Sequence, residues 1–295
     1  MRDIKKSLKT SILLIIISLI ISIGIKFSLK IDNPVFLKSY LDMNYYENED
    51  MYSFSGHNLE LKYITNKGDK RQVTSVIFDD APYLDLIVSE NNISGFMTFY
   101  DGVNSNIESY GPYDIHTVFI DLDMSRRNKK LEEVIKLDKA KVYFNNGESM
   151  DVDLGKIILS KYKENQSPLD SIGMNGSSDG SSQSIFYVTD NIFVSKVYSQ
   201  LFEYSRDLFE FNIDKLGYLE EQDVVYNKYE HLYFTSQFHN IEDPSRKLSR
   251  YDIKPNIYFE DKDGNEYMKE VQNISYTPNF NFKDIYNYLK SQGEL

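Results

Sequence analysis

An uninterrupted apolar run near the N-terminus is the strongest pattern in the chain. Residues 11–25 have the sequence SILLIIISLIISIGI, without a charged side chain. The apolar segment at 8–27 would form a helix about 30 Å long, which matches the hydrocarbon core of a bilayer. Lys9 and Lys26 lie near its two ends, where their ammonium groups can reach water. We therefore predict a transmembrane anchor which, with a short cytoplasmic N-terminus, occupies residues 1–30.

Positive charge before the apolar run predicts the orientation of this anchor. The basic residues there are Arg2, Lys5, Lys6 and Lys9, against the single acid Asp3. Basic segments tend to stay in the cytoplasm, so we expect the N-terminus inside and the rest of the chain outside the membrane.

Two alternatives account for the same apolar run. A cleaved secretory signal would need small residues three and one positions before the cut, and Ser22 and Gly24 supply them. A buried helix of a soluble protein is disfavoured, because this helix would have no polar face to meet water. An uncleaved anchor is the preferred interpretation.

Alternating apolar and polar residues predict strands over most of the remaining chain. Residues 139–156 contain two such runs around Asn146-Gly147, and 256–274 contain two around Asp263-Gly264; both dipeptides favour tight hairpins. Upstream, 59–64 and 73–78 flank a short turn-like segment, which predicts a further pair of joined strands.

Only a few segments have helical periodicity. We predict a helix at 34–45, with Asn33 as its cap and Pro34 in its first turn, and a second helix at 282–292. Residues 196–214 fit a helix in their first half and a strand in their second.

A segment rich in Ser, Gly, Asn and Asp predicts the division into domains. Residues 164–184 have too little apolar surface to offset the entropy of ordering them, which indicates a flexible linker. The flanking β-rich modules would be 31–163 and 185–295. The predicted fold class is therefore mainly β, α+β with few helices: an N-terminal transmembrane helix followed by two tandem β-sandwich-like modules.

The two halves show a weak resemblance to each other. A shift of 115 residues places VTSVIF at 73–78 on VTDNIF at 188–193, and His116 on His231. We interpret this as an internal duplication. The alternative is two unrelated segments that share strand-forming residues.

Composition narrows the chemistry that the chain can perform. It has no cysteine, which excludes disulfides, thiolate metal sites and cysteine nucleophiles. The net charge is −12; residues 1–30 carry +5, which leaves −17 on the rest. Such a surface repels phosphate backbones, so we expect no nucleic-acid partner. The two alanines, Ala81 and Ala140, against abundant Asn, Ile, Lys and Tyr fit an AT-rich bacterial genome.

One motif suggests a hydrolase. Gly176, Ser178 and Gly180 form a Gly-x-Ser-x-Gly pattern, and His231 and His239 follow in the chain order of a catalytic triad. A nucleophile elbow needs a buried strand before the serine and a helix after it. The strand is missing, because Pro168, Asp170 and Gly173 before the motif are turn signals, so a flexible linker is favoured here.

A second motif suggests calcium. Asp261, Asp263, Gly264 and Glu270 match four positions of the twelve-residue calcium loop, but Phe259 occupies the first ligand position. Strand-like sequence on both sides favours a hairpin turn.

The other acidic and histidine residues also lack a ligand-like spacing. Carboxylate pairs that we expect on solvated faces are Asp79 with Asp80, Asp121 with Asp123, and Asp151 with Asp153. None of the histidines, His57, His116, His231 and His239, has the spacing of a metal motif. For the related pair His116 and His231 we expect structural roles. We assign no catalytic, cofactor-binding or metal residue and expect no cofactor.

Two basic loops and the many aromatic residues offer binding chemistry. The loops are Arg126, Arg127, Lys129 and Lys130, and Arg246, Lys247 and Arg250. They could recognise an acidic ligand, but we favour neutralisation by nearby acids, such as Glu132, Glu133, Glu242 and Asp243. The 24 Tyr and 18 Phe residues raise carbohydrate binding as an alternative to an aromatic core.

The preferred function is a non-catalytic, membrane-anchored binding, sensor or accessory protein of a bacterial cell envelope. The membrane is one expected partner, and an envelope protein is a candidate second one. The alternatives are an extracytoplasmic hydrolase whose site only the fold assembles, and a structural subunit of an envelope complex. The binding residues stay unassigned.

Overall fold

The computed structural model describes the following residues: 2–48, 51–54, 59–84, 86–90, 107–122, 133–161, 167–177, 180–214, 224–271 and 274–295. The helical elements are α1 (Arg2–Ser28), α2 (Phe202–Ser205), the 3-10 turn η1 (Arg206–Leu208), α3 (Pro244–Lys247) and α4 (Phe282–Gln292). The strands of the N-terminal half are β1 (Val35–Phe36), β2 (Ser39–Asn48), β3 (Met51–Phe54), β4 (Leu59–Asn66), β5 (Val73–Phe78), β6 (Ile87–Ser89), β7 (Ile107–Tyr110), β8 (Tyr113–Asp121), β9 (Val134–Phe144) and β10 (Ser149–Lys161). Those of the C-terminal half are β11 (Leu169–Gly176), β12 (Ser181–Val188), β13 (Ile192–Tyr198), β14 (Phe209–Ile213), β15 (Val224–Tyr226), β16 (His231–Phe238), β17 (Arg250–Ile253), β18 (Asn256–Asp261), β19 (Glu266–Glu270) and β20 (Ile274–Tyr276).

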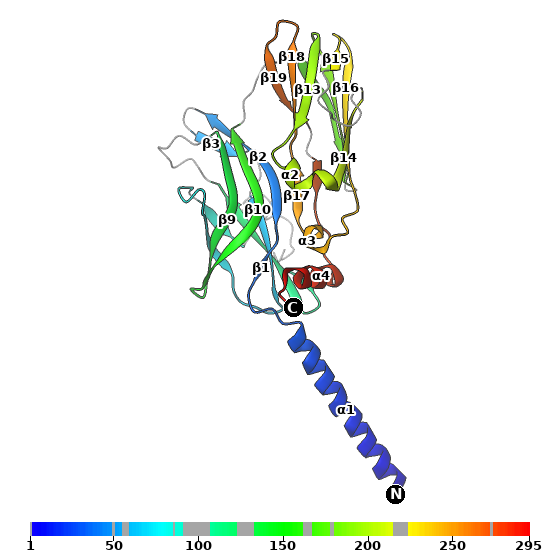
Figure 1. The fold of residues 1–295 in the computed structure, drawn as a ribbon. Coiled ribbons are helices and arrows are strands. Elements are labelled where there is room, and N and C mark those ends of the chain that lie inside the picture. Colours follow the sequence, from blue (N-terminus) through cyan, green and yellow to red (C-terminus); the bar gives the residue numbers. More distant parts are fainter. Residues whose placement is uncertain are drawn as a thin grey trace, which may run out of the picture.

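The predicted fold class is confirmed: a long apolar helix leads into a body made of two β-sandwich modules (Figure 1). In the first module a sheet of order β1-β4-β8-β6, with β7 also on β8, faces a larger sheet of order β20-β17-β2-β10-β9-β5, with β3 also on β2. In the second, sheet β11-β12-β16-β14 faces sheet β15-β13-β18-β19. Each module encloses its own apolar core.

The two modules share a sheet. Strand β2 pairs in parallel with β10 of the N-terminal half on one side and with β17 of the C-terminal half on the other. Ile158 of β10 belongs to the second core. The rings of Tyr40 on β2 and Tyr251 on β17 stack with centroids 5.0 Å apart. The modules are therefore joined through a continuous hydrogen-bonded layer.

The flexible linker predicted at 164–184 is wrong for the residues that the structure describes. Strands β11 and β12 form an antiparallel pair there, and β12 also pairs with β16. Ser182 and Ser184 are inward-facing and buried, and the Ser182 hydroxyl lies 2.6 Å from that of Ser236. The small polar residues that suggested disorder are thus paired inside the sandwich.

The helix predicted at 34–45 is also wrong, because this segment forms β1 and β2. Leu41 belongs to the first core, while Tyr40 packs against the second. A central strand that is buried on both faces has consecutive apolar residues, and these resemble a helical stripe. Residues 196–214 divide into the end of β13, α2, η1 and β14.

The other local predictions are mostly confirmed. Strands β9 and β10 form the hairpin around Asn146-Gly147, β18 and β19 the one around Asp263-Gly264, and α4 lies at 282–292. The segments 59–64 and 73–78 are strands, but they do not pair with each other. Strand β4 pairs with β8 and β5 with β9, so their connection crosses between the two sheets.

The modules repeat one strand order: β1-β4-β8 corresponds to β11-β12-β16, and β5-β9-β10 to β13-β18-β19. The uniform shift of 115 is not the structural register, because His116 faces inward on β8 whereas His231 is exposed on β16. A slip of one residue reverses the face on which a strand residue lies. The internal duplication stays a prediction.

Gly155 permits the close approach of β10 to β2. It has a φ of 90°, and a Cβ added there would lie 2.6 Å from the carbonyl oxygen of Ser39. Gly147 has a similar φ of 86° but nothing within 4 Å of an added Cβ. The two glycines differ in steric room and share their backbone conformation.

We expect Gly155→Ala to lower the free energy of unfolding by about 2 kcal/mol more than Gly147→Ala does, because only the former forces β10 away from β2. Gly147→Ala, the matched control, should cost about 1 kcal/mol through its positive φ alone. Urea denaturation measures both. Equal losses would show that the seam between β2 and β10 is not tightly packed.

Candidate functional site

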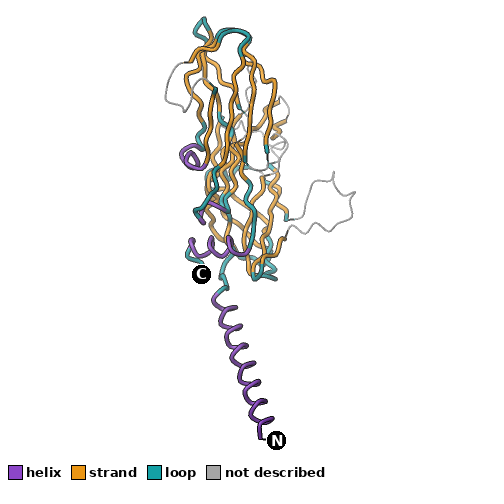
Figure 2. Tube along the Cα trace, turned by 90° about the vertical axis from the view of Figure 1, so that its right-hand side faces the viewer, coloured by secondary structure: helices purple, strands orange, loops and turns teal. Residues whose placement is uncertain are grey.

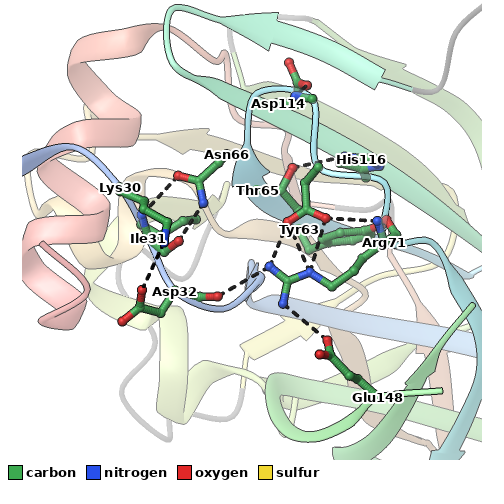
Figure 3. Close-up of polar contacts among 12 residues, drawn as sticks. Lys30, Ile31, Asp32, Tyr63, Thr65, Asn66, Arg71, Asp114, His116 and Glu148 are labelled. Carbon is green, nitrogen blue, oxygen red and sulfur yellow. Dashed lines mark hydrogen bonds and ion pairs between the residues drawn. The ribbon is translucent and has the colours of Figure 1, made fainter. Parts of the chain in front are cut away.

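A short set of contacts fixes the end of α1 to the first module (Figure 3). Asn66, the last residue of β4, accepts a hydrogen bond from the Ile31 amide at 3.1 Å and donates one to the Ile31 carbonyl at 2.5 Å. The Tyr113 hydroxyl donates to the Leu29 carbonyl at 2.8 Å. The Ile31 side chain is buried in a third apolar cluster. The chain is thus held within three residues of Ser28, where α1 ends.

Arg71 strengthens this junction. Its guanidinium binds the Asp69 carboxylate at 2.7 Å, approaches Glu148 at 3.6 Å and donates to the Asp32 carbonyl at 3.4 Å. Burial alone would raise the pKa of Asp69, but the hydrogen bonds from Arg71 outweigh it and hold that pKa below its usual value. The β4–β5 connection is therefore tied to the chain that leaves the helix.

A buried polar cluster lies beside the junction. The Tyr63 hydroxyl and the Val73 amide both donate to one oxygen of Glu90, at 2.6 Å each. His116 lies 3.4 Å from the other oxygen through Nδ1 and 3.1 Å from the Thr65 hydroxyl through Nε2. The pKa of Tyr63 is raised, mainly because the hydroxyl is buried and secondly because it donates a hydrogen bond to Glu90.

The carboxylate–histidine–hydroxyl order of this cluster has the composition of a catalytic relay, but a substrate cannot reach it. His116 is 1% exposed and Glu90 9%. The cluster joins β4, β5, β8 and the residue that follows β6 inside the first sandwich. This burial supports a structural role for His116.

The hydrolase motif lies in a hairpin. Gly176 ends β11 and Gly180 precedes β12, its antiparallel partner, while Ser178 lies outside the described residues. His239 is exposed and approaches Glu210 at 3.8 Å. A strand–turn–strand context does not provide the strained strand-to-helix turn of a nucleophile elbow.

The acidic motifs also occupy turns and solvated faces. Asp261 accepts hydrogen bonds from the amides of Asp263 and Asn265 at 2.9 Å, within the β18–β19 turn. Hydrogen bonds, first of all from the Asn265 side chain, lower the pKa of Asp261 to about 2. On β10, Asp151 and Asp153 are both exposed. Over the described part of the chain, no group of three or more His, Asp or Glu residues could hold a metal ion.

Positions predicted from other motifs fall as follows. Asp79 and Asp80 form the turn after β5, Asp121 is the exposed end of β8, and His57, Asp123 and the first basic loop at 126–130 lie outside the described residues.

The second basic loop is neutralised inside the protein, by acids other than those predicted. Arg246 forms a bidentate pair with Asp207, at 2.6 and 2.9 Å, which raises the pKa of Arg246. Lys247 binds Asp284 at 3.0 Å, and Arg250 lies 3.5 Å from Glu60. The expected neutralisation is present, and it holds α3 to its neighbours.

A polar groove of about 470 Å³ lies on the second module, a feature that the sequence did not reveal. The strand register aligns Asn175, Gln183, Thr235 and Asn212 in one row across β11, β12, β16 and β14. A second row contains Ser181, Gln237 and Glu210. The side chains of Gln183, Thr235 and Asn212 alternate with buried neighbours and face outward.

The groove is suited to a neutral polar ligand. Amide and hydroxyl side chains each offer a donor and an acceptor, and those in one row lie about 5 Å apart across the sheet. Among the described residues that line the groove, none is a lysine or arginine. Tyr233 and Tyr187 continue the same outward face along β16 and β12, and Tyr233 is 40% exposed. The surface thus combines an amide half with an aromatic half.

These features define a class: a tandem β-sandwich protein that carries a long apolar N-terminal helix and has no accessible catalytic cluster among its described residues. No family model matches the sequence, and no curated protein does either.

Three solved structures among those that match are the D00-D0 domain of intimin, a protein from Porphyromonas gingivalis W83, and the fibronectin(III)-like modules of Clostridium thermocellum CbhA. Their identities are 7%, 9% and 10%, and their TM-scores 0.22, 0.23 and 0.19. The matches cover 83%, 81% and 84% of this chain and 100%, 97% and 94% of the matched chains. Because these TM-scores are low, the architecture is defined by the strand pairing described above and not by the matches.

We expect Tyr63→Phe to destabilise the protein by about 1–3 kcal/mol, because it removes a hydrogen bond from the buried Glu90 carboxylate. Tyr110→Phe is the matched control, since it removes the same kind of tyrosine–glutamate bond, to Glu108, at an exposed site. The control should change stability by less than about 0.5 kcal/mol. Thermal denaturation of both variants measures the difference, and equal effects would contradict the structural role of the cluster.

Proposed function

We propose that this chain is a non-catalytic, membrane-anchored binding protein held on the outer side of a bacterial cell membrane. The observation that carries the proposal is α1. Its segment Ser11–Ser28 has a mean hydropathy of 2.4, and none of it is buried against the body. Isoleucine and leucine side chains along it are 44–66% exposed. Leaving this much apolar surface in water costs about 25 cal/mol per Å², so lipid is the fitting environment.

The absence of cysteine allows a clean test of topology. We expect Lys228→Cys, on an exposed position of the second module, to react with a membrane-impermeant maleimide in intact cells. Ser7→Cys, which preserves the basic residues before the apolar run, should react only after the membrane is permeabilised. Mass spectrometry of the membrane-bound protein should find its first 24 residues retained.

Two results would overturn the anchored topology. Labelling of Ser7→Cys but not of Lys228→Cys in intact cells would show the opposite orientation. Loss of the first 24 residues, with the body in the medium, would show a cleaved secretory signal instead.

For the ligand, we propose a neutral, hydroxyl-rich glycan bound in the groove on β11, β12, β16 and β14. The chemistry of the lining supports this choice. Side-chain amides can donate to and accept from neighbouring sugar hydroxyls, and tyrosine rings pack against the C–H faces of sugars. The net charge of −12 and the lack of a cation among the described lining residues disfavour an anionic polymer.

Soluble neutral hexasaccharides of β-1,4-linked glucose and N-acetylglucosamine are the probes for this site. By titration calorimetry we expect at least one to bind, and the double variant Gln183→Ala/Asn212→Ala to weaken that binding about tenfold or more, the loss expected for one or two hydrogen bonds. Gln292→Ala, which removes an exposed amide on α4, is the control and should bind normally. Failure of both probes to bind, or equal affinity of the double variant, would refute the glycan site.

A further inference from the structure

Helix α4 lies across the base of the body, next to the end of α1, in both views of the fold (Figures 1 and 2). Its buried residues Ile285, Tyr288 and Leu289 pack in the same apolar cluster as Ile31, which follows α1 by three residues. An Asn281 cap and the left-handed Gly293 define its two ends. The C-terminal helix and the exit of the anchor therefore share one packed unit.

The geometry of the junction fixes how far this base can lie from a membrane. Three residues, from Ser28 to Ile31, span at most about 10 Å even when fully extended. The headgroup layer on each side of the hydrocarbon core is about 5–8 Å thick. Tyr113 also donates to the carbonyl of Leu29, which keeps the chain against the body. If α1 spans the bilayer, the base must lie at the level of the headgroups.

Aromatic side chains gather at this base. The Phe282 ring lies 6.2 Å from that of Tyr113, and Tyr110 lies 6.2 Å from Phe280. Phe282, the first residue of α4, is a large apolar side chain that is 42% exposed. An added Cβ at Gly111, in the β7–β8 turn, would lie 3.2 Å from the Phe282 ring, so this turn and the helix form one surface.

Lysine side chains at the base also fit a lipid interface. Lys30, Lys283 and Lys290 are exposed; of the acids there, Asp32 lies 3.9 Å from Lys30 and Asp284 3.0 Å from Lys247, while Glu108 and Glu294 are exposed. Aromatic rings and lysines with long apolar stems are enriched where proteins meet headgroups.

We propose that the base formed by α4 and the β7–β8 turn rests in the headgroup layer, with Phe282 as its central contact. This proposal rests on the anchored topology proposed above. The lipid surface is the partner. Contact of the base with the headgroups would restrict rotation of the body relative to its anchor.

The chain contains no tryptophan, so single tryptophans can report depth without interference. The full-length variants Ile20→Trp, Phe282→Trp and Tyr233→Trp would be reconstituted in phosphatidylcholine–phosphatidylglycerol vesicles. The vesicles would contain lipid that is either brominated on its acyl chains or spin-labelled on its headgroup. Gln292→Trp, on an exposed position of α4, serves as a second probe if Phe282→Trp alters thermal unfolding.

We expect the headgroup label to quench Phe282→Trp at least twofold and to leave Tyr233→Trp, on the second module, unquenched. Acyl-chain bromine should quench Ile20→Trp. If Ile20→Trp is quenched but neither α4 probe is, the base stands clear of the membrane; this inference then fails while the anchored function holds. If Ile20→Trp is not quenched, the anchored function fails, and this inference with it.

Discussion

The parallel pairing of β2 with β10 on one side and β17 on the other is the constraint on which the rest of the structure depends. Because β10 and β17 come from different halves of the chain, this pairing makes two sandwiches into one body. Asp42 lies on the seam and accepts hydrogen bonds from the Ser199 hydroxyl at 2.9 Å and the Lys254 amide at 3.0 Å. Burial raises the pKa of Asp42 to about 6, and the hydrogen bonds from Lys254 and Ser199 partly offset that rise by stabilising the carboxylate.

The membrane anchor proposed for α1 would be attached to this rigid body without a linker. Asn66, Arg71 and Tyr113 hold the first residues after α1. If α1 spans a membrane as proposed, its orientation is transmitted to the first module, and through the seam to the second. The groove on the second module would then lie at a fixed height and angle above the lipid. A flexible tether, as the composition of 164–184 suggested, would have allowed neither.

Local features of the fold were predictable from sequence, and tertiary ones were not. Hairpins at Asn146-Gly147 and Asp263-Gly264, and the capped helix at 282–292, depend on residues close together in the chain. The segment 34–45 forms β1 and β2 although its apolar residues have helical spacing, because Tyr40 and Leu41 are adjacent apolar residues that pack on opposite faces of β2. Nor could the sequence show that β4 and β5 lie in different sheets, since that depends on long-range pairing.

The candidate groove shows why composition alone does not reveal this polar face of the sheet. Asn175, Ser181 and Gln183 belong to the segment whose composition predicted disorder. In the structure this segment is paired in a sheet: the inward side chains of Ser182 and Ser184 are buried in the sandwich, while polar side chains alternate with them on the outward face. Asn212 and Thr235 join the row only through the register of β14 and β16. The small polar residues that hid the strands from sequence reasoning are thus the ones that give this sheet face its capacity for hydrogen bonding.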